Sequence, residues 1–108
     1  MDKNQITVGL CGPGRHEMPV SEFIFPPVVE HPLDFEANFD LASLFLQDVI
    51  DETPLNFVLY ITGLTPVLTA FLNAWELRNE PAGFRLYDQL TLMHFDRDSG
   101  SYKPQVWN

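Results

Sequence analysis

The sequence predicts one small α/β domain with a mainly parallel sheet, two principal helices and a C-terminal β-hairpin. Apolar runs of strand composition alternate with helical patterns, an order typical of parallel sheets. The apolar run at residues 56–62 also leads directly into a helix start at Thr65-Pro66. A chain of 108 residues has the length of a single domain, so residues 1–108 are expected to fold as one unit.

Composition and charge limit the kinds of molecule that this chain is expected to bind. Fifteen acidic residues against six basic ones give a formal net charge of −9, which disfavours duplex DNA and anionic membranes as partners. Hydrophobic residues make up 45% of the chain, more than a disordered chain carries. The apolar runs fall well short of the about 20 residues that span a bilayer, and there is no signal core. We therefore expect a cytoplasmic protein.

The first strand is predicted at residues 5–10, where Ile6, Val8 and Leu10 alternate with other side chains. Residues 11–17 contain two glycines flanking a proline and should form a loop. If this strand is parallel to the one at residues 56–62, the loop lies at the carboxyl edge of the sheet. Open α/β folds bind ligands at that edge.

Residues 18–34 show no clear periodicity. Residues 21–25 resemble a short strand that ends before Pro26-Pro27, and Pro32 blocks a helix. The apolar content of this stretch is too high for a free linker. We expect Phe23, Phe25 and Val28 to pack on the domain or on a partner.

The first helix is expected to begin between Asp34 and Asp40, which are both favourable N-cap residues. Pro54 disfavours helical geometry at Thr53 and so closes the helix by residues 50–54. Helical spacing predicts a buried face formed by Leu41, Leu44, Phe45 and Val49.

The strand at residues 56–62 is rich in β-branched and aromatic residues, which indicates burial on both faces. Gly63 allows a sharp turn, Thr65 is a suitable N-cap, and Pro66 suits the first helical position. The helix from Pro66 ends at residues 79–83. Its predicted buried stripe consists of Val67, Leu68, Phe71, Leu72 and Trp75.

The last third of the chain predicts a hairpin. A short extended piece at residues 84–87 precedes a third principal strand at residues 90–95. Residues 96–100 form a turn, and residues 102–107 return beside the strand. Pro104 cannot donate to a sheet, so this returning strand is expected at the edge.

Polar residues with binding chemistry collect after the ends of the principal strands. A helix N-terminus together with guanidinium and imidazole groups suits a phosphate, a nucleotide or another anion. Each feature also has a structural interpretation: the glycine turn as a simple junction, the arginines as solvated charges, and His94 as a hydrogen-bonding residue in the helix layer. The candidate ligand-binding residues are Arg15, His16, Thr62, Gly63, Thr65, His94 and Arg97.

The sequence identifies no catalytic set. Cys11 is expected to be a buried thiol, and the alternative is a nucleophile with His16 as its base. The glycines of residues 9–14 lack the lysine and the following helix of a P-loop. No spacing of His, Cys or carboxylate side chains predicts a metal site, and we expect no cofactor.

Residues 59–66 resemble the strand, glycine turn and helix start of Rossmann-like CARF domains and of related CRISPR ring nucleases. CARF domains sense cyclic oligoadenylates. The resemblance covers about ten residues and implies that Thr62, Gly63 and Thr65 contact the phosphates of a cyclic oligonucleotide. Arg97 would supply the basic group. These 108 residues are fewer and more acidic than those of a usual CARF domain, and we expect no effector domain among them.

The alternative is a noncatalytic interaction module that offers an acidic surface to a basic protein or to a second copy. In character the chain is similar to small acidic phage or mobile-element proteins that inhibit bacterial defence complexes of the CRISPR type. Residues 23–28 would contribute apolar contacts. The acidic surface would consist of Asp34, Glu36, Asp40, Asp48, Asp51 and Glu52, which otherwise form a solvated helical face.

Overall fold

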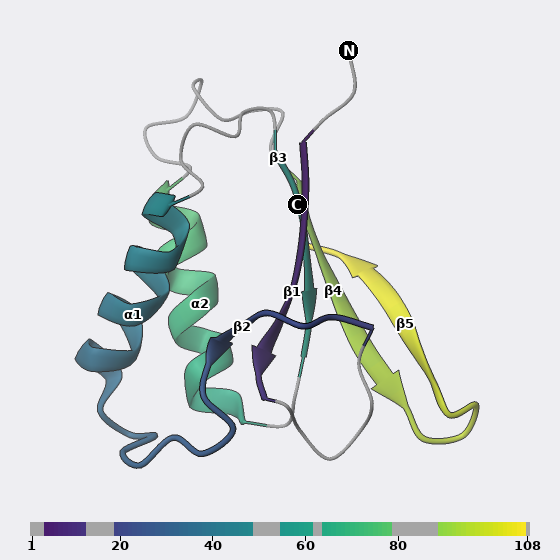
Figure 1. The fold of residues 1–108 in the computed structure, drawn as a ribbon, viewed down its shortest axis with the longest axis horizontal. Coiled ribbons are helices and arrows are strands. Elements are labelled where there is room, and N and C mark those ends of the chain that lie inside the picture. The colour runs from purple at the N-terminus through teal and green to yellow at the C-terminus, as the bar shows by residue number, and fades with distance from the viewer. Residues whose placement is uncertain (1–3, 13–18, 49–54, 62–63, 79–88, 108) are drawn as a thin grey trace.

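The computed structural model describes residues 4–12, 19–48, 55–61, 64–78 and 89–107. These residues form a five-stranded sheet in the order β2-β1-β3-β4-β5 and two helices, α1 and α2 (Figure 1). The first four strands are mutually parallel, and β5 is antiparallel to β4. The predicted α/β class, parallel sheet and C-terminal hairpin are therefore confirmed.

The strands and helices lie close to their predicted positions. The predicted extended piece at residues 84–87 lies outside the described residues. The elements are β1 (Asn4–Cys11), β2 (Phe23–Phe25), α1 (Phe35–Asp48), β3 (Leu55–Tyr60), α2 (Thr65–Arg78), β4 (Gln89–Asp96) and β5 (Ser101–Val106).

Both helices cover the same face of the sheet (Figure 1). The chain crosses from β2 to β3 through α1 and from β3 to β4 through α2, always in the same direction along the strand order. Right-handed crossovers in one direction place their helices on one side. The core between helices and sheet is built on side chains that are fully buried: Val8, Leu10, Phe57, Leu59, Val67, Phe71, Trp75 and Leu90.

The α2 stripe is as predicted, and its aromatic residues pack on β3. The ring of Phe57 lies 5.3 Å from that of Phe71 and 5.6 Å from that of Trp75, measured between centroids. Phe45 of α1 approaches Phe57 edge-on at 6.3 Å. Phe57 thus joins β3 to both helices at one point of the core.

The predicted buried face of α1 is wrong in part. Leu41 and Leu44 are 39% and 59% exposed, whereas Ala42 and Leu46 are buried, and Val49 lies outside the described residues. The helix packs against α2, and the small Ala42 lies on the buried side. Asn38 is also buried, because its side-chain amide donates a hydrogen bond to the carbonyl of Pro32 (2.9 Å).

The start of α1 lies within the predicted interval. Its first residue is Phe35, and the carboxylate of Asp34 accepts a hydrogen bond from the N–H of Ala37 (3.1 Å). This is the bond that an N-cap side chain makes with the third helical residue. Asp34 therefore fixes where the helix begins.

The β4–β5 hairpin is closed by the turn at residues 97–100. The carboxylate of Asp96 accepts hydrogen bonds from the hydroxyl of Ser99 (2.8 Å) and the N–H of Asp98 (3.1 Å). Gly100 has φ +68°, a left-handed conformation that favours glycine. Pro104 lies on β5, at the end of the strand order, which confirms the predicted edge strand.

Candidate functional site

The strand order creates a point where the chain leaves neighbouring strands in opposite directions. After β1 the chain moves to β2 on one side, and after β3 it moves to β4 on the other. β1 and β3 are adjacent and parallel, with Gly9 level with Tyr60, so their carboxyl ends meet at one edge. In open α/β sheets the crevice outside such a pair of strand ends is the usual ligand position. We call this edge, with Gly12, Ile61 and residues 64–67, the switch-point edge.

The N-terminus of α2 lies at the switch-point edge. The N–H of Leu68 donates to the carbonyl of Leu64 (3.3 Å), so Leu64 takes the N-cap position and Thr65 is the first helical residue. The N-cap therefore lies one residue earlier than predicted. Pro66 has no N–H, which leaves the N–H groups of Leu64, Thr65 and Val67 without an acceptor inside the helix.

No negative side chain in the first turn of α2 offsets the partial positive charge of the helix N-terminus. The first turn of α2 contains no acidic residue, in contrast to that of α1, which contains Glu36. A helix N-terminus carries a partial positive charge, so an anion there is favoured. Thr65 is exposed and places a hydroxyl group at this position.

The end of β1 is held in place by β2. The thiol of Cys11 donates to the carbonyl of Pro26 (2.7 Å), and the N–H of Gly12 donates to the carbonyl of Phe25 (3.2 Å). Burial raises the pKa of the Cys11 thiol, which disfavours the thiolate that a nucleophile needs. The expectation of a buried Cys11 is confirmed.

His94 and Arg97 lie on the hairpin, apart from the start of α2. Met93 of β4 pairs with Tyr60, the last residue of β3. β4 continues to Asp96, so Arg97 lies beyond the end of β3. Figure 1 shows the β4–β5 turn curving away from α2. The Nε2–H of exposed His94 donates to Oε1 of Gln105 on β5 (2.6 Å), rather than into the helix layer.

The remaining predicted residues, Arg15, His16, Thr62 and Gly63, lie outside the described residues. Within the described part, no group of three or more His, Cys, Asp or Glu side chains could hold a metal ion. In that same part, neither helix has the length and apolar character needed to cross a membrane.

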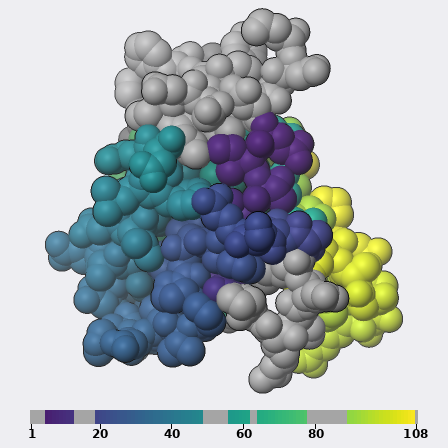
Figure 2. All heavy atoms as spheres, viewed as in Figure 1, coloured from purple at the N-terminus to yellow at the C-terminus, as the bar shows by residue number. Residues whose placement is uncertain are grey.

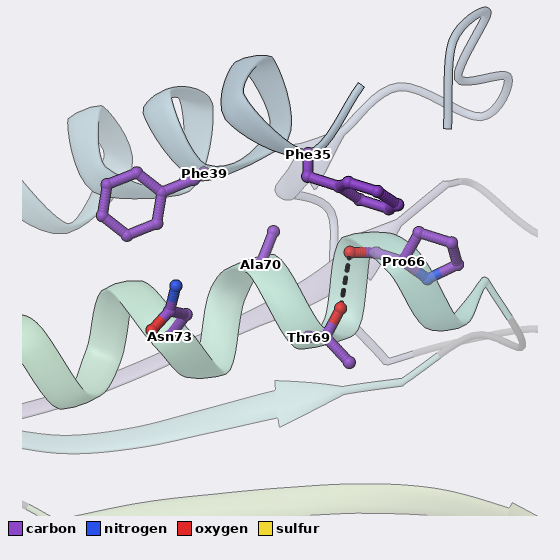
Figure 3. A pocket seen from close by; sticks show the side chains of 6 residues that line it. All are labelled: Phe35, Phe39, Pro66, Thr69, Ala70 and Asn73. Carbon is purple, nitrogen blue, oxygen red and sulfur yellow. Dashed lines mark hydrogen bonds between the residues drawn. The ribbon is translucent and has the colours of Figure 1, made fainter. Parts of the chain in front are cut away.

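A cleft between the two helices lies beside the start of α2, and no sequence pattern indicates it. It has a volume of about 290 Å³ and is lined by Phe35 and Phe39 of α1 and by Pro66, Thr69, Ala70 and Asn73 of α2. Figure 3 shows the Phe35 ring above Pro66. The hydroxyl of Thr69 donates to the carbonyl of Pro66 (3.0 Å), so it is used within the helix.

Comparison with protein-family models, with curated proteins and with solved structures gives no match to this chain.

Proposed function

We propose that this chain binds an anionic ligand, a nucleotide or a cyclic oligonucleotide, at the switch-point edge. The observation that carries the proposal is that the connections after the adjacent parallel strands β1 and β3 lead to opposite sides of the sheet, to β2 and to β4. Open α/β folds hold their ligands beside strand ends that are arranged in this way.

The chemistry of the edge supports an anion. The N–H groups of Leu64, Thr65 and Val67 precede the first hydrogen bond of α2, and no carboxylate of its first turn competes for them. A phosphate oxygen accepts such donors well. The resemblance of residues 59–66 to CARF domains is the reason for including cyclic oligoadenylates among the ligands.

The proposal uses fewer residues than the site predicted from the sequence. Thr65 remains at its centre, whereas Arg15, His16, Thr62 and Gly63 lie outside the described residues and stay predictions. Arg97 stands on the hairpin beyond the end of β3, so it contributes at most a distant charge to the binding energy.

The proposal is tested by placing a carboxylate at the helix start. Thr65→Glu should stabilise the free protein by about 0.3–1 kcal/mol, because a negative charge there interacts with the helix dipole. The same charge should weaken anion binding about five- to thirtyfold, since two like charges roughly 8 Å apart repel by about 1–2 kcal/mol at an effective dielectric constant of 20–40. Calorimetric titration with phosphate, AMP, ATP and cyclic tetra-adenylate measures the affinity, and thermal unfolding measures the stability.

Thr69→Glu is the matched control, because it adds the same charge to an exposed residue of the same helix, one turn further along. It should change both the stability and the affinity less than Thr65→Glu. Equal loss of affinity in the two variants would contradict binding at the helix start. Absence of saturable heat or thermal shift across the whole panel would contradict the proposed function itself.

A further inference from the structure

The outer side of α1 carries apolar side chains that the domain does not bury. Leu41 and Leu44 are 39% and 59% exposed, and Val28, in the segment before α1, is 74% exposed. Ala37, Leu41 and Leu44 follow one another at helical spacings of four and three residues, so they lie on one side of the helix. We call Val28, Ala37, Leu41 and Leu44 the α1 outer surface.

This surface borders an open groove of about 570 Å³. Its lining includes Phe25, Pro26 and Val28 from the chain before α1, and Ala37, Leu41 and the buried Asn38 from α1. In Figure 2 the chain from β2 to α1, coloured blue, forms a continuous part of the molecular surface. The groove can therefore receive apolar side chains from outside the domain.

The charge around the groove has a single sign. Lysine and arginine are absent from residues 16–77 of the sequence. Among the described residues that line the groove, Glu30 and Asp34 are acidic, and His31 is the only one with a nitrogen base. Of the carboxylates, Asp34 already accepts the N–H of Ala37. Exposed acidic side chains on α1 and in the segment before it are Glu22, Glu30, Asp34, Glu36, Asp40 and Asp48.

We propose that the α1 outer surface docks a cationic amphipathic segment of a partner protein, with its apolar residues in the groove and its Lys or Arg residues against the acidic rim. An apolar groove in an acidic surround matches a segment of that composition in both properties. A second copy of this chain matches poorly, because a symmetric contact would place carboxylates against carboxylates. The docking surface lies on α1 and is independent of the ligand proposed at the switch-point edge.

The probe is a fluorescein-labelled peptide of 18 leucines and lysines with all leucines on one helical face. A scrambled peptide of the same composition, without an apolar face, is the control for simple charge attraction. Fluorescence anisotropy should give saturable binding of the amphipathic peptide, at least tenfold tighter than that of the scrambled one. In ¹⁵N-labelled protein, the amide shifts should concentrate in residues 28–34 and in α1.

Two pairs of variants separate the apolar and the charged contributions. Leu41→Gln/Leu44→Gln should weaken binding about tenfold or more, whereas Leu77→Gln, at a residue of α2 that is 51% exposed, should leave it within twofold. Asp40→Asn/Asp48→Asn should reduce the salt dependence of binding, and Glu76→Gln on α2 should reduce it less. Far-UV circular dichroism checks that each variant keeps its helices.

Three results would overturn the proposal. The first is equal binding of the amphipathic and scrambled peptides, which would leave only charge attraction. The second is an equal loss of affinity in Leu77→Gln and Leu41→Gln/Leu44→Gln. The third is a concentration-dependent dimer in sedimentation velocity that Leu41→Gln/Leu44→Gln dissociates, since this would assign the surface to a second copy.

Discussion

Replacing Phe57 by leucine tests whether one side chain of β3 holds the two helices on the sheet. Phe57 is fully buried, and its ring contacts Phe45, Phe71 and Trp75 at centroid distances of 6.3, 5.3 and 5.6 Å. Leucine keeps an apolar side chain in place but removes three aromatic contacts at once. Because α2 packs on β3 through this cluster, the change also loosens the support of the switch-point edge.

The size of the effect follows from these contacts. Each aromatic pair contributes about 0.5–1.5 kcal/mol beyond the area it buries. The three pairs share one ring, so their contributions do not simply add, and leucine recovers part of the packing. We expect Phe57→Leu to lower the free energy of unfolding by about 2–3 kcal/mol, a large part of the roughly 5–16 kcal/mol expected for a domain of this length.

Urea denaturation followed by circular dichroism measures the change. With a denaturant slope of about 1–2 kcal/mol per molar urea, the unfolding midpoint should fall by roughly 1–3 M without a change in slope. Phe35→Leu is the matched control, because the Phe35 side chain is 64% exposed and should lose less than about 0.5 kcal/mol. The reasoning about the aromatic cluster is refuted if both variants shift the midpoint equally.

Two further predictions concern helix and hairpin ends. Asp34→Ala removes the acceptor of the Ala37 N–H and should lower the free energy of unfolding by about 1 kcal/mol in urea titrations, and a change below about 0.3 kcal/mol would exclude this cap as a stabilising contact. Hydrogen bonds from the Ser99 hydroxyl and the Asp98 N–H hold the pKa of Asp96 below its usual value in the folded state. The hairpin should therefore keep the stabilisation from Asp96 above pH 3.8, the usual value, and lose it as the pH falls through the lower, folded pKa. Asp96→Asn should remove this pH dependence in NMR titrations of the turn, and an unchanged dependence would assign it to another group.

The sequence was sufficient to predict the α/β fold class and the order of helices and strands along the chain. The junction at Thr65-Pro66 could be located because a strand of β-branched and aromatic residues leads directly to a proline that suits the first turn of a helix. Pro104 likewise indicated an edge strand, because proline has no backbone N–H to donate to a neighbouring strand. These signals act within a few residues, so they do not depend on the rest of the fold.

The buried side of α1 could not be predicted in the same way. Its hydrophobic residues are spread around the helix, and the side that faces the core is set by packing against α2 and by the hydrogen bond from Asn38 to Pro32. A polar residue buried by a hydrogen bond to a distant carbonyl gives no apolar signal. The helical pattern therefore selected Leu41 and Leu44, which the structure exposes.

Arg97 follows a strand that is longer than its neighbour, since β4 continues to Asp96 beyond the level at which β3 ends. Parallel strands share a carboxyl edge, and the sequence correctly indicated this for β1, β3 and β4. Local sequence patterns do not indicate how far β4 extends beyond β3 or in which direction the hairpin curves. Strand order, which identifies the switch-point edge between β1 and β3, was likewise not readable from local patterns.

Amide chemical-shift mapping during nucleotide titration tests the central claim most directly. The ¹⁵N-labelled protein would be titrated with whichever compound of the phosphate, AMP, ATP and cyclic tetra-adenylate panel gives the largest calorimetric response. Binding at the switch-point edge predicts the largest shifts at the amides of Gly12, Ile61, Leu64, Thr65 and Val67. Shifts confined to the β4–β5 turn or to the outer side of α1, with these five amides unmoved, would contradict it.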